Sequence, residues 1–182
     1  MSASGDIMTN IRKLTFAGVI AALYAALTIG LVFISFGPIQ FRVAEALTVL
    51  PFFFPHTVWG LFIGVIISNI FSPYGLLDVL VGSSATLLAG LITMRIGLID
   101  RDSLVMKILA CLPPVIVNAI AIGAMLTWLY TGGDQMFAPF MFMSFFITFG
   151  LQVGFGQIVV LYALGLPLLI ALPKLPFDRW GL

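Results

Sequence analysis

The sequence predicts an all-α polytopic membrane protein: residues 1–182 form one integral membrane domain, a six-helix transmembrane bundle. Of its 182 residues, 62% are hydrophobic and only 8% are charged, and the mean hydropathy is +1.21. Soluble globular domains carry about 25% charged residues, so this composition excludes a water-soluble fold. At roughly 20 residues for each crossing, the length allows about six or seven spans and no additional soluble domain.

Charge and rare residues exclude several classes of function. Eight basic against seven acidic residues leave a net charge of +1, which lacks the basic excess that nucleic-acid binding requires. The single cysteine, Cys111, cannot form an internal disulfide or a cysteine-rich metal site. The sequence contains no phosphate-binding loop and no zinc-protease motif, and its one histidine, His56, is interpreted as an interface residue. We therefore expect no enzyme activity, no cofactor, no metal and no nucleic-acid partner.

The first expected span covers residues 14–34. This apolar run of about 21 residues is too long for the core of a signal peptide, and it has no obvious cleavage site. Gly37, Pro38 and Arg42 interrupt the apolar run and end the span.

The remaining five spans are less uniform in length. Residues 43–56 form a shorter apolar piece, and Pro51 and Pro55 predict that this span is bent or incomplete. Four further apolar runs follow, over residues 57–72, 77–96, 104–130 and 139–171.

The distribution of basic residues predicts the orientation of these six spans. With both termini in the cytoplasm, seven of the eight basic residues lie inside: Arg12, Lys13, Arg95, Arg101, Lys107, Lys174 and Arg179. Only Arg42 then lies outside. This bias follows the positive-inside rule, so we expect a multi-pass protein of the cell membrane with both termini in the cytoplasm.

Polar side chains gather toward the outer side of this predicted bundle. Ionisable groups at membrane depth cost roughly 2.5 to 3.5 kcal/mol each, which makes each one a candidate for function. Three distant segments bring a cation, two carboxylates, an amide and aromatic rings to similar depth, a composition typical of a pocket for a small polar ligand, and the deeper Asn118 and Gln157 could form its floor. The predicted substrate-binding residues are Arg42, Glu45, Asn69, Asp78, Asn118, Trp128 and Gln157.

Each of these residues also has a purely structural interpretation. Arg42 and Glu45, three positions apart, are able to pair with each other at a helix start. Asp78 is able to cap the N-terminus of its helix. Trp128 is suited to anchoring its helix at the membrane interface. Interhelical hydrogen bonds are the alternative for the amides, Asn69, Asn118 and Gln157.

Small residues recur every four positions on the first span. Ala17, Ala21 and Ala25 form a smooth stripe, with Ala22 and Ala26 beside it, where another helix can approach closely. Packing inside the chain's own bundle is one interpretation of this stripe, and contact with a partner protein is the other.

Two segments resemble a known family. FRVAEALTVLPFF, residues 41–53, and VWGLFIGVIISNIFSPYGLLDVLVGSSATLLAG, residues 58–90, are similar to the QueT family, the S components through which energy-coupling factor (ECF) transporters take up queuosine precursors. The resemblance implies a six-helix subunit that binds its ligand outside and works with a transmembrane coupling protein and two cytoplasmic ATPases. It also implies that Ala17, Ala21 and Ala25 contact the coupling protein, through the family's A-x-x-x-A motif.

The implied ligand is a 7-deazaguanine such as preQ0, preQ1 or queuine. Its guanine-type edge presents N1–H beside an amino group, which Glu45 or Asp78 can accept. The ring carbonyl would take a hydrogen bond from Arg42, Asn69 or Asn118, and stacking is open to Trp128, Phe36 or Phe137. The alternatives are an S component for another vitamin or nucleobase, a membrane-embedded enzyme, or a structural membrane subunit that transports nothing.

Overall fold

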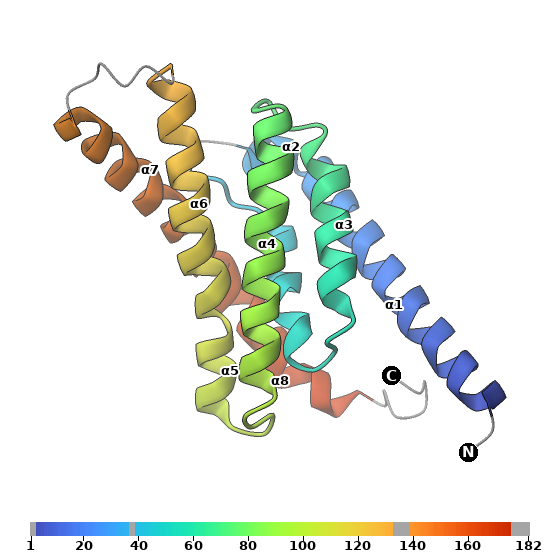
Figure 1. The fold of residues 1–182 in the computed structure, drawn as a ribbon. Helices are drawn as coiled ribbons and strands as arrows, with labels where there is room; N and C mark the ends of the chain where they lie inside the picture. Colours follow the sequence, from blue (N-terminus) through green and yellow to red (C-terminus); the bar gives the residue numbers. More distant parts are fainter. Residues whose placement is uncertain (1–2, 37–38, 133–138, 176–182) are drawn as a thin grey trace.

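The computed structural model describes residues 3–36, 39–132 and 139–175, and these ranges contain helices and no strand (Figure 1). The all-α prediction is therefore confirmed over the described residues. In chain order the elements are α1 (Ala3–Gly30), α2 (Val32–Ser35), the 3-10 helix η1 (Val43–Phe52), α3 (Thr57–Asn69), α4 (Leu76–Gly97), α5 (Leu104–Ala110), α6 (Leu112–Tyr130), α7 (Pro139–Val160), the π-helical turn η2 (Leu161–Gly165), α8 (Leu166–Ala171) and η3 (Leu172–Lys174).

The predicted count of six transmembrane helices is not confirmed. Four helical segments are long and apolar enough to cross a membrane, namely Met8–Gly30, Leu76–Gly97, Leu104–Tyr130 and Phe140–Lys174. The predicted spans 43–56 and 57–72 correspond to η1, of 10 residues, and α3, of 13 residues. Each of these helices is about 20 Å long, whereas the hydrocarbon core is about 30 Å thick. Pro51 inside η1 removes a backbone donor, which disfavours a regular α-helix there.

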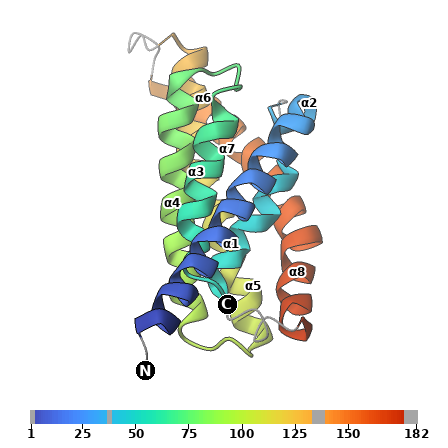
Figure 2. The ribbon, with the colours of Figure 1, turned by 90° about the vertical axis from the view of Figure 1, so that its right-hand side faces the viewer.

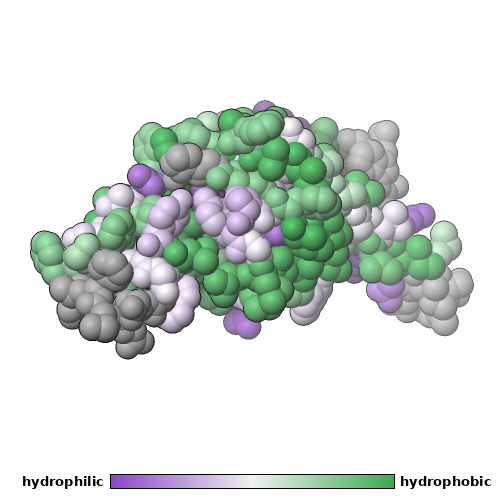
Figure 3. Space-filling view, turned by 90° about the horizontal axis from the view of Figure 1, so that it is seen from above, coloured by the Kyte–Doolittle hydropathy of each residue, from purple (hydrophilic) through white to green (hydrophobic). Residues whose placement is uncertain are grey.

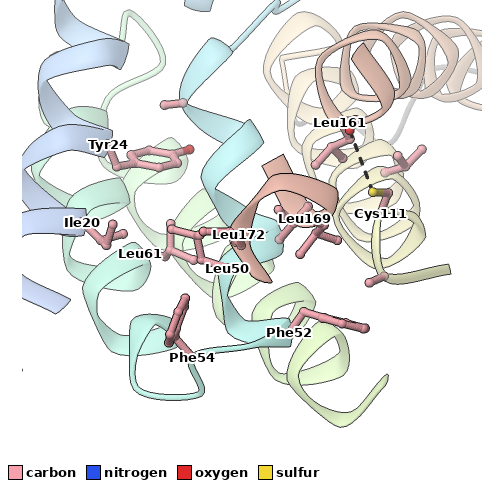
Figure 4. Packing of buried hydrophobic residues seen from close by; sticks show 14 of the residues in the cluster. Ile20, Tyr24, Leu50, Phe52, Phe54, Leu61, Cys111, Leu161, Leu169 and Leu172 are labelled. Atoms are coloured by element: carbon pink, nitrogen blue, oxygen red, sulfur yellow. Dashed lines mark hydrogen bonds between the residues drawn. The ribbon is translucent and has the colours of Figure 1, made fainter. Parts of the chain in front are cut away.

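Two of the long segments are interrupted near prolines. The helix over 104–130 breaks at Cys111, just before Pro113 and Pro114. The last segment widens into η2, just before Pro167, whose ring nitrogen has no hydrogen to donate to the preceding turn. The two breaks meet in space: the thiol of Cys111 lies 3.9 Å from the carbonyl oxygen of Leu161 (Figure 4).

The short helix η1 lies at the centre of the bundle. It contacts α1, α3, α4 and η2, while α1 packs on α3 and α6 packs on α7 (Figures 1 and 2). The main hydrophobic core surrounds it, with Tyr24, Leu50, Phe52, Leu61 and Leu169 all buried (Figure 4). The two helices that are too short to span lipid alone are thus enclosed or flanked by longer ones.

The alanine stripe of α1 is part of this internal packing. A Cβ atom on Gly60 of α3 would overlap the carbonyl oxygen of Ala17, and one on Gly64 would lie 2.8 Å from that of Ala21. Ala17, Ala21 and Ala25 are buried. The arrangement matches the internal-packing interpretation, and these alanines present no outward surface in this structure. The exposed small residues of α1 are the neighbouring set, Gly18, Ala22, Ala26 and Gly30.

The outer surface is apolar, as lipid contact requires. Leu14, Phe33 and Phe140 are 75%, 93% and 81% exposed. Seen from the end where α2 lies, hydrophobic residues cover much of the perimeter and weakly polar ones lie near the middle (Figure 3). A surface of this kind is stable in a bilayer and would aggregate in water.

Candidate functional site

A small polar cavity lies where η1, α4, α6 and α7 meet. It encloses about 230 Å³ of space between atoms, and its walls are Gln40, Arg42, Glu45, Gly82, Thr86, Asn118, Ile122, Val153 and Gln157. The walls lie so close together that the space accommodates about one water molecule. Polar groups from four elements therefore converge at one point inside an otherwise apolar bundle.

Glu45 is the carboxylate that faces this cavity. It lies in the first turn of η1 and is only 1% exposed. The hydroxyl of Tyr24 donates to Oε1 at 2.6 Å, and Nδ2 of Asn118 donates to Oε2 at 3.3 Å. A carboxylate offers about four acceptor positions, so these two bonds fix its orientation and leave acceptor capacity for a ligand.

Arg42 is held rigidly beside Glu45. Its Nη2 lies 3.1 Å from Oδ2 of Asp78, and its Nη1 donates to Oδ1 of Asn69 at 3.3 Å. Nε donates to the backbone oxygen of Ser35 at 3.3 Å, and the guanidinium lies 4.7 Å from the centre of the Phe36 ring. A buried charge is tolerated only when it is paired and hydrogen-bonded, and these contacts meet that requirement.

Asn69 and Asp78 support Arg42 from behind rather than lining the cavity. Nδ2 of Asn69 donates to the backbone oxygen of Asp78 at 2.8 Å, which joins the end of α3 to the start of α4. The absence of a side chain at Gly82 makes room for them, because a Cβ there would lie 2.5 Å from the Asn69 nitrogen. The two residues thus set where the Arg42 guanidinium lies.

Two glutamines complete the wall with unused hydrogen-bonding atoms. Nε2 of Gln40 and Oε1 of Gln157 are buried and have no partner among the described residues. Gln40 has a positive φ of 51°, which is uncommon for a residue with a side chain. The backbone of Ile39 and Gln40 packs against α7 at Gly156, where a Cβ would collide with the carbonyl oxygen of Ile39. One free donor and one free acceptor therefore face a buried space, a costly arrangement that a polar ligand would relieve.

The structure brings most of the predicted site residues together. Arg42, Glu45, Asn118 and Gln157 line the cavity, whereas Trp128 lies elsewhere on α6 with 49% of its surface exposed. Sequence reasoning overlooked Tyr24 and Gln40. The predicted stacking residue Phe137 lies outside the described residues, and Phe36 packs on Arg42.

Comparison with known proteins places the chain in a family. A model of the QueT transporter family matches residues 14–174. The chain belongs to the QueT transporter family. A protein of Lactococcus lactis subsp. cremoris named "Queuosine precursor transporter QueT" is 42% identical over 85 residues. The alignment covers 46% of this chain and 48% of that protein, so the chain matches about half the length of this curated relative. No solved structure matches.

Membership of the QueT transporter family agrees with the character of the site. The chain is a multi-pass membrane protein, and its cavity offers acceptors and donors suited to holding a polar molecule. In the described part of the chain, no group of three or more His, Cys, Asp or Glu side chains forms a metal site. The matched range includes all four elements whose side chains form the cavity.

Proposed function

We propose that this chain is the substrate-binding S component of an ECF-type importer and that it takes up a queuosine precursor across the cytoplasmic membrane. The observation that carries the proposal is the buried Glu45 carboxylate, oriented by Tyr24 and Asn118 toward a cavity inside a QueT-family protein. A 7-deazaguanine such as preQ0, preQ1 or queuine presents two adjacent N–H donors, and one carboxylate accepts both in a bidentate pair.

The other cavity groups complement the rest of such a ring. In this proposal Nε2 of Gln40 and the Arg42 guanidinium donate to the ring carbonyl, since a carbonyl oxygen accepts two hydrogen bonds. Oε1 of Gln157 accepts from the N–H of the five-membered ring. Both glutamine atoms lack partners among the described residues, so the ligand would supply the hydrogen bonds that the protein leaves unmade.

The charges at the site favour a ligand that carries a positive group. The site contains one cation, Arg42, and two carboxylates, Glu45 and Asp78. Arg42 already forms an ion pair with Asp78. While Glu45 accepts from the ring donors, the net negative charge of these three side chains would attract the aminomethyl cation of preQ1 through space, and preQ0 lacks that cation. We therefore expect preQ1 to bind more tightly than preQ0.

The cavity is narrower than a fused heterocycle, so binding requires its walls to separate. In this proposal the contact between the backbone of Ile39 and Gln40 and Gly156 of α7 closes one side of the space. We propose that ligand entry parts this contact, because it joins a short connecting segment to α7 by packing alone, and no backbone hydrogen bond links the two among the described residues.

Energy for transport would come from partner proteins. The sequence lacks an ATP-binding phosphate loop, so we propose that a transmembrane coupling protein and two cytoplasmic ATPases drive uptake. The coupling protein was predicted to contact Ala17, Ala21 and Ala25, which are buried. We propose that it contacts the exposed residues beside them, Gly18, Ala22 and Ala26. Small residues there would let a partner helix approach closely in lipid.

Ligand binding to the purified protein tests the proposal directly. Isothermal titration with preQ0, preQ1 and queuine should show binding by the unmodified chain, and Glu45→Gln should weaken it about 10- to 100-fold, because an amide cannot accept from both ring donors. Trp128→Phe is the matched control, since its side chain lies away from the cavity, and it should bind normally. Unchanged binding by Glu45→Gln would contradict the proposed role of the carboxylate.

Two further outcomes distinguish the alternatives. Tight binding of a B vitamin or an unmodified nucleobase, with no binding of the three deazaguanines, would indicate an S component for another ligand. If Glu45→Gln and Asp78→Asn are expressed normally and cells still take up the queuosine precursor, the structural-subunit alternative is favoured. The buried polar groups at the cavity favour the transport proposal, because a structural subunit gains nothing from unpaired donors and acceptors in its interior.

Co-purification tests whether the coupling protein contacts the exposed face of α1 formed by Gly18, Ala22 and Ala26. Ala22→Trp should abolish recovery of a coupling protein while ligand binding persists, because Ala22 is exposed and far from the cavity walls. Ile120→Trp, on an exposed position of α6, is the control and should leave recovery unchanged. Equal recovery with both variants would remove the assignment of this face.

A further inference from the structure

A second cavity lies near the end of the bundle opposite α2, and it shares no residue with the polar cavity. It is open to the surroundings and contains about 570 Å³ of space between the start of α1, the turn that joins η1 to α3, and the loop that joins α4 to α5. Figures 1 and 2 show these three segments at the same end of the molecule. The lining residues are Lys13, Phe53, Phe54, Pro55, His56 and Arg101.

The polar lining of this cavity is entirely basic. Lys13 and Arg101 come from segments far apart in the sequence, and no carboxylate lines the space. Among the described side chains, neither residue forms a salt bridge. Arg101 donates its Nε to the carbonyl oxygen of Gly97 at 3.4 Å, which leaves the two terminal nitrogens of the guanidinium available.

His56 lines the same cavity and carries an unused polar atom. Its Nε2 is buried and has no hydrogen-bond partner among the described residues. The imidazole packs against two aromatic rings, with centroids 5.7 Å from Phe16 and 6.1 Å from Phe54. Two cations and a histidine with an unpartnered ring nitrogen thus line one cavity whose walls contain no carboxylate, although Asp100 and Asp102 flank Arg101 in the sequence, and an anion rich in oxygen acceptors satisfies all three.

The position of the cavity relative to the bilayer indicates which class of anion it would meet. Lys13 lies five residues into the candidate span that begins at Met8, and Arg101 lies four residues after the span that ends at Gly97. Both charges are therefore near the depth of the lipid head groups. Phe53 and Phe54 supply an apolar wall, and Lys107 lies 5.8 Å from the centre of the Phe53 ring.

We propose that this cavity binds the phosphate head group of an anionic phospholipid. Lys13 and Arg101 hold the phosphate oxygens, His56 faces the same group, and the acyl chains leave along the apolar wall of Phe53 and Phe54. Basic pockets between membrane helices bind anionic head groups in this way. The site is independent of the transported ligand.

Native mass spectrometry of the detergent-purified chain tests the site. The unmodified protein should bind phosphatidylglycerol about tenfold more tightly than phosphatidylcholine, and Lys13→Gln with Arg101→Gln should remove this preference. The control is Arg95→Gln with Lys174→Gln, which deletes two exposed cations that do not line the cavity. The proposal would be overturned if the Arg95→Gln, Lys174→Gln control also lost the preference for phosphatidylglycerol. It would equally be overturned if the Lys13→Gln, Arg101→Gln variant kept that preference.

Inorganic phosphate distinguishes a lipid from a soluble anion. For a lipid site, phosphate at millimolar concentration should leave the phosphatidylglycerol adduct in place, because only the lipid gains from burying acyl carbon against Phe53 and Phe54. Displacement of the lipid by millimolar phosphate would overturn the lipid assignment and indicate a site for a soluble anion.

The pH dependence of lipid binding gives an independent readout. Burial and the nearby Lys13 ammonium lower the pKa of His56 below its ordinary value of 6.5. Lys13 and Arg101 share its cavity, and Lys107 lies by the adjoining Phe53. A bound phosphate favours the protonated imidazole, so affinity should rise as the pH falls below 6.5. His56→Gln should abolish this rise, and an identical pH profile in that variant would exclude contact between His56 and the anion.

Discussion

Tyr24 ties the first helix to the polar cavity through one hydroxyl. It is completely buried, and its hydroxyl donates to Glu45 at 2.6 Å, a short bond typical of a charged acceptor. Tyr24→Phe keeps the ring and removes the donor. We expect the free energy of unfolding to fall by about 1 to 3 kcal/mol, measured by thermal unfolding in detergent. Tyr162→Phe, whose exposed hydroxyl donates to Ile108, should cost much less, and equal losses would contradict the importance of the Tyr24 bond.

Arg42 and Asp78 form an ion pair that is buried on both sides. Asp78→Asn leaves the guanidinium without its carboxylate, and breaking a buried pair in this way costs roughly 3 to 5 kcal/mol. The double variant Arg42→Gln with Asp78→Asn removes both charges and should regain part of the loss. Chemical unfolding of Asp78→Asn, Arg42→Gln, the double variant and the unmodified chain provides the cycle, and strictly additive losses would show that the two charges do not interact.

Residue types predicted which charged side chains would meet inside the bundle, and their role in binding stays a prediction. Arg42, Glu45 and Asp78 were found because a charged group at membrane depth is costly and therefore conspicuous. Tyr24 was overlooked because a tyrosine within an apolar span resembles an ordinary core residue, and only its partner reveals its role. Gln40 was overlooked because it follows Gly37 and Pro38 in an expected loop, and its burial depends on the distant helix α7.

At the level of elements, the contact between α1 and α3 depends on two glycines. Gly60→Ala would push a Cβ into the carbonyl oxygen of Ala17, so the helices must separate, and we expect a clear drop in melting temperature. Gly18→Ala is the matched control, because nothing lies within 4 Å of its Cβ position. The control should be neutral or stabilising by about 0.5 to 1 kcal/mol, since alanine favours helix more than glycine does. A similar drop in both would rule out close helix approach as the cause.

The face of a helix is harder to predict than its existence. On α1 two sets of small residues recur at the same spacing, one beginning at Ala17 and the other at Gly18, and periodicity alone cannot decide which faces inward. What decides which set faces inward is on α3, where Gly60 and Gly64 have the same spacing and let α1 approach closely. Trp128 shows a related difficulty: it is predicted for the site from its place at the outer end of α6, but α6 lines the cavity at Asn118 and Ile122, and the Trp128 side chain is half exposed.

At the scale of the whole molecule, the distribution of basic residues still predicts the orientation. In a Cys111→Ala background, a membrane-impermeant maleimide should label Gly132→Cys, at the end of α6, in intact cells. Asp102→Cys, in the loop between α4 and α5, should react only after permeabilisation. The two positions are exposed and terminate the same helical segment at opposite ends. The reverse pattern would place the basic end of the bundle outside.

The all-helical class followed from composition, but the number of full spans did not. Hydropathy identifies apolar stretches, and residues 43–56 and 57–72 are apolar without being long enough as helices. Pro51 predicted that the first of these segments, residues 43–56, would not form a regular helix. What hydropathy could not show is that η1 lies at the centre of the bundle, where other helices rather than lipid surround its backbone.

The shortness of η1 and α3 has a consequence for biogenesis. A segment of 10 or 13 residues is a weak signal for the insertion machinery, which recognises stretches of about 20. The two helices are therefore expected to enter the bilayer as one hairpin and to settle only when α4 has emerged from the ribosome. Until Asp78 arrives with α4, Arg42 has no counter-ion in its final position, so the same charges that shape the cavity also set the order in which the nascent chain can assemble.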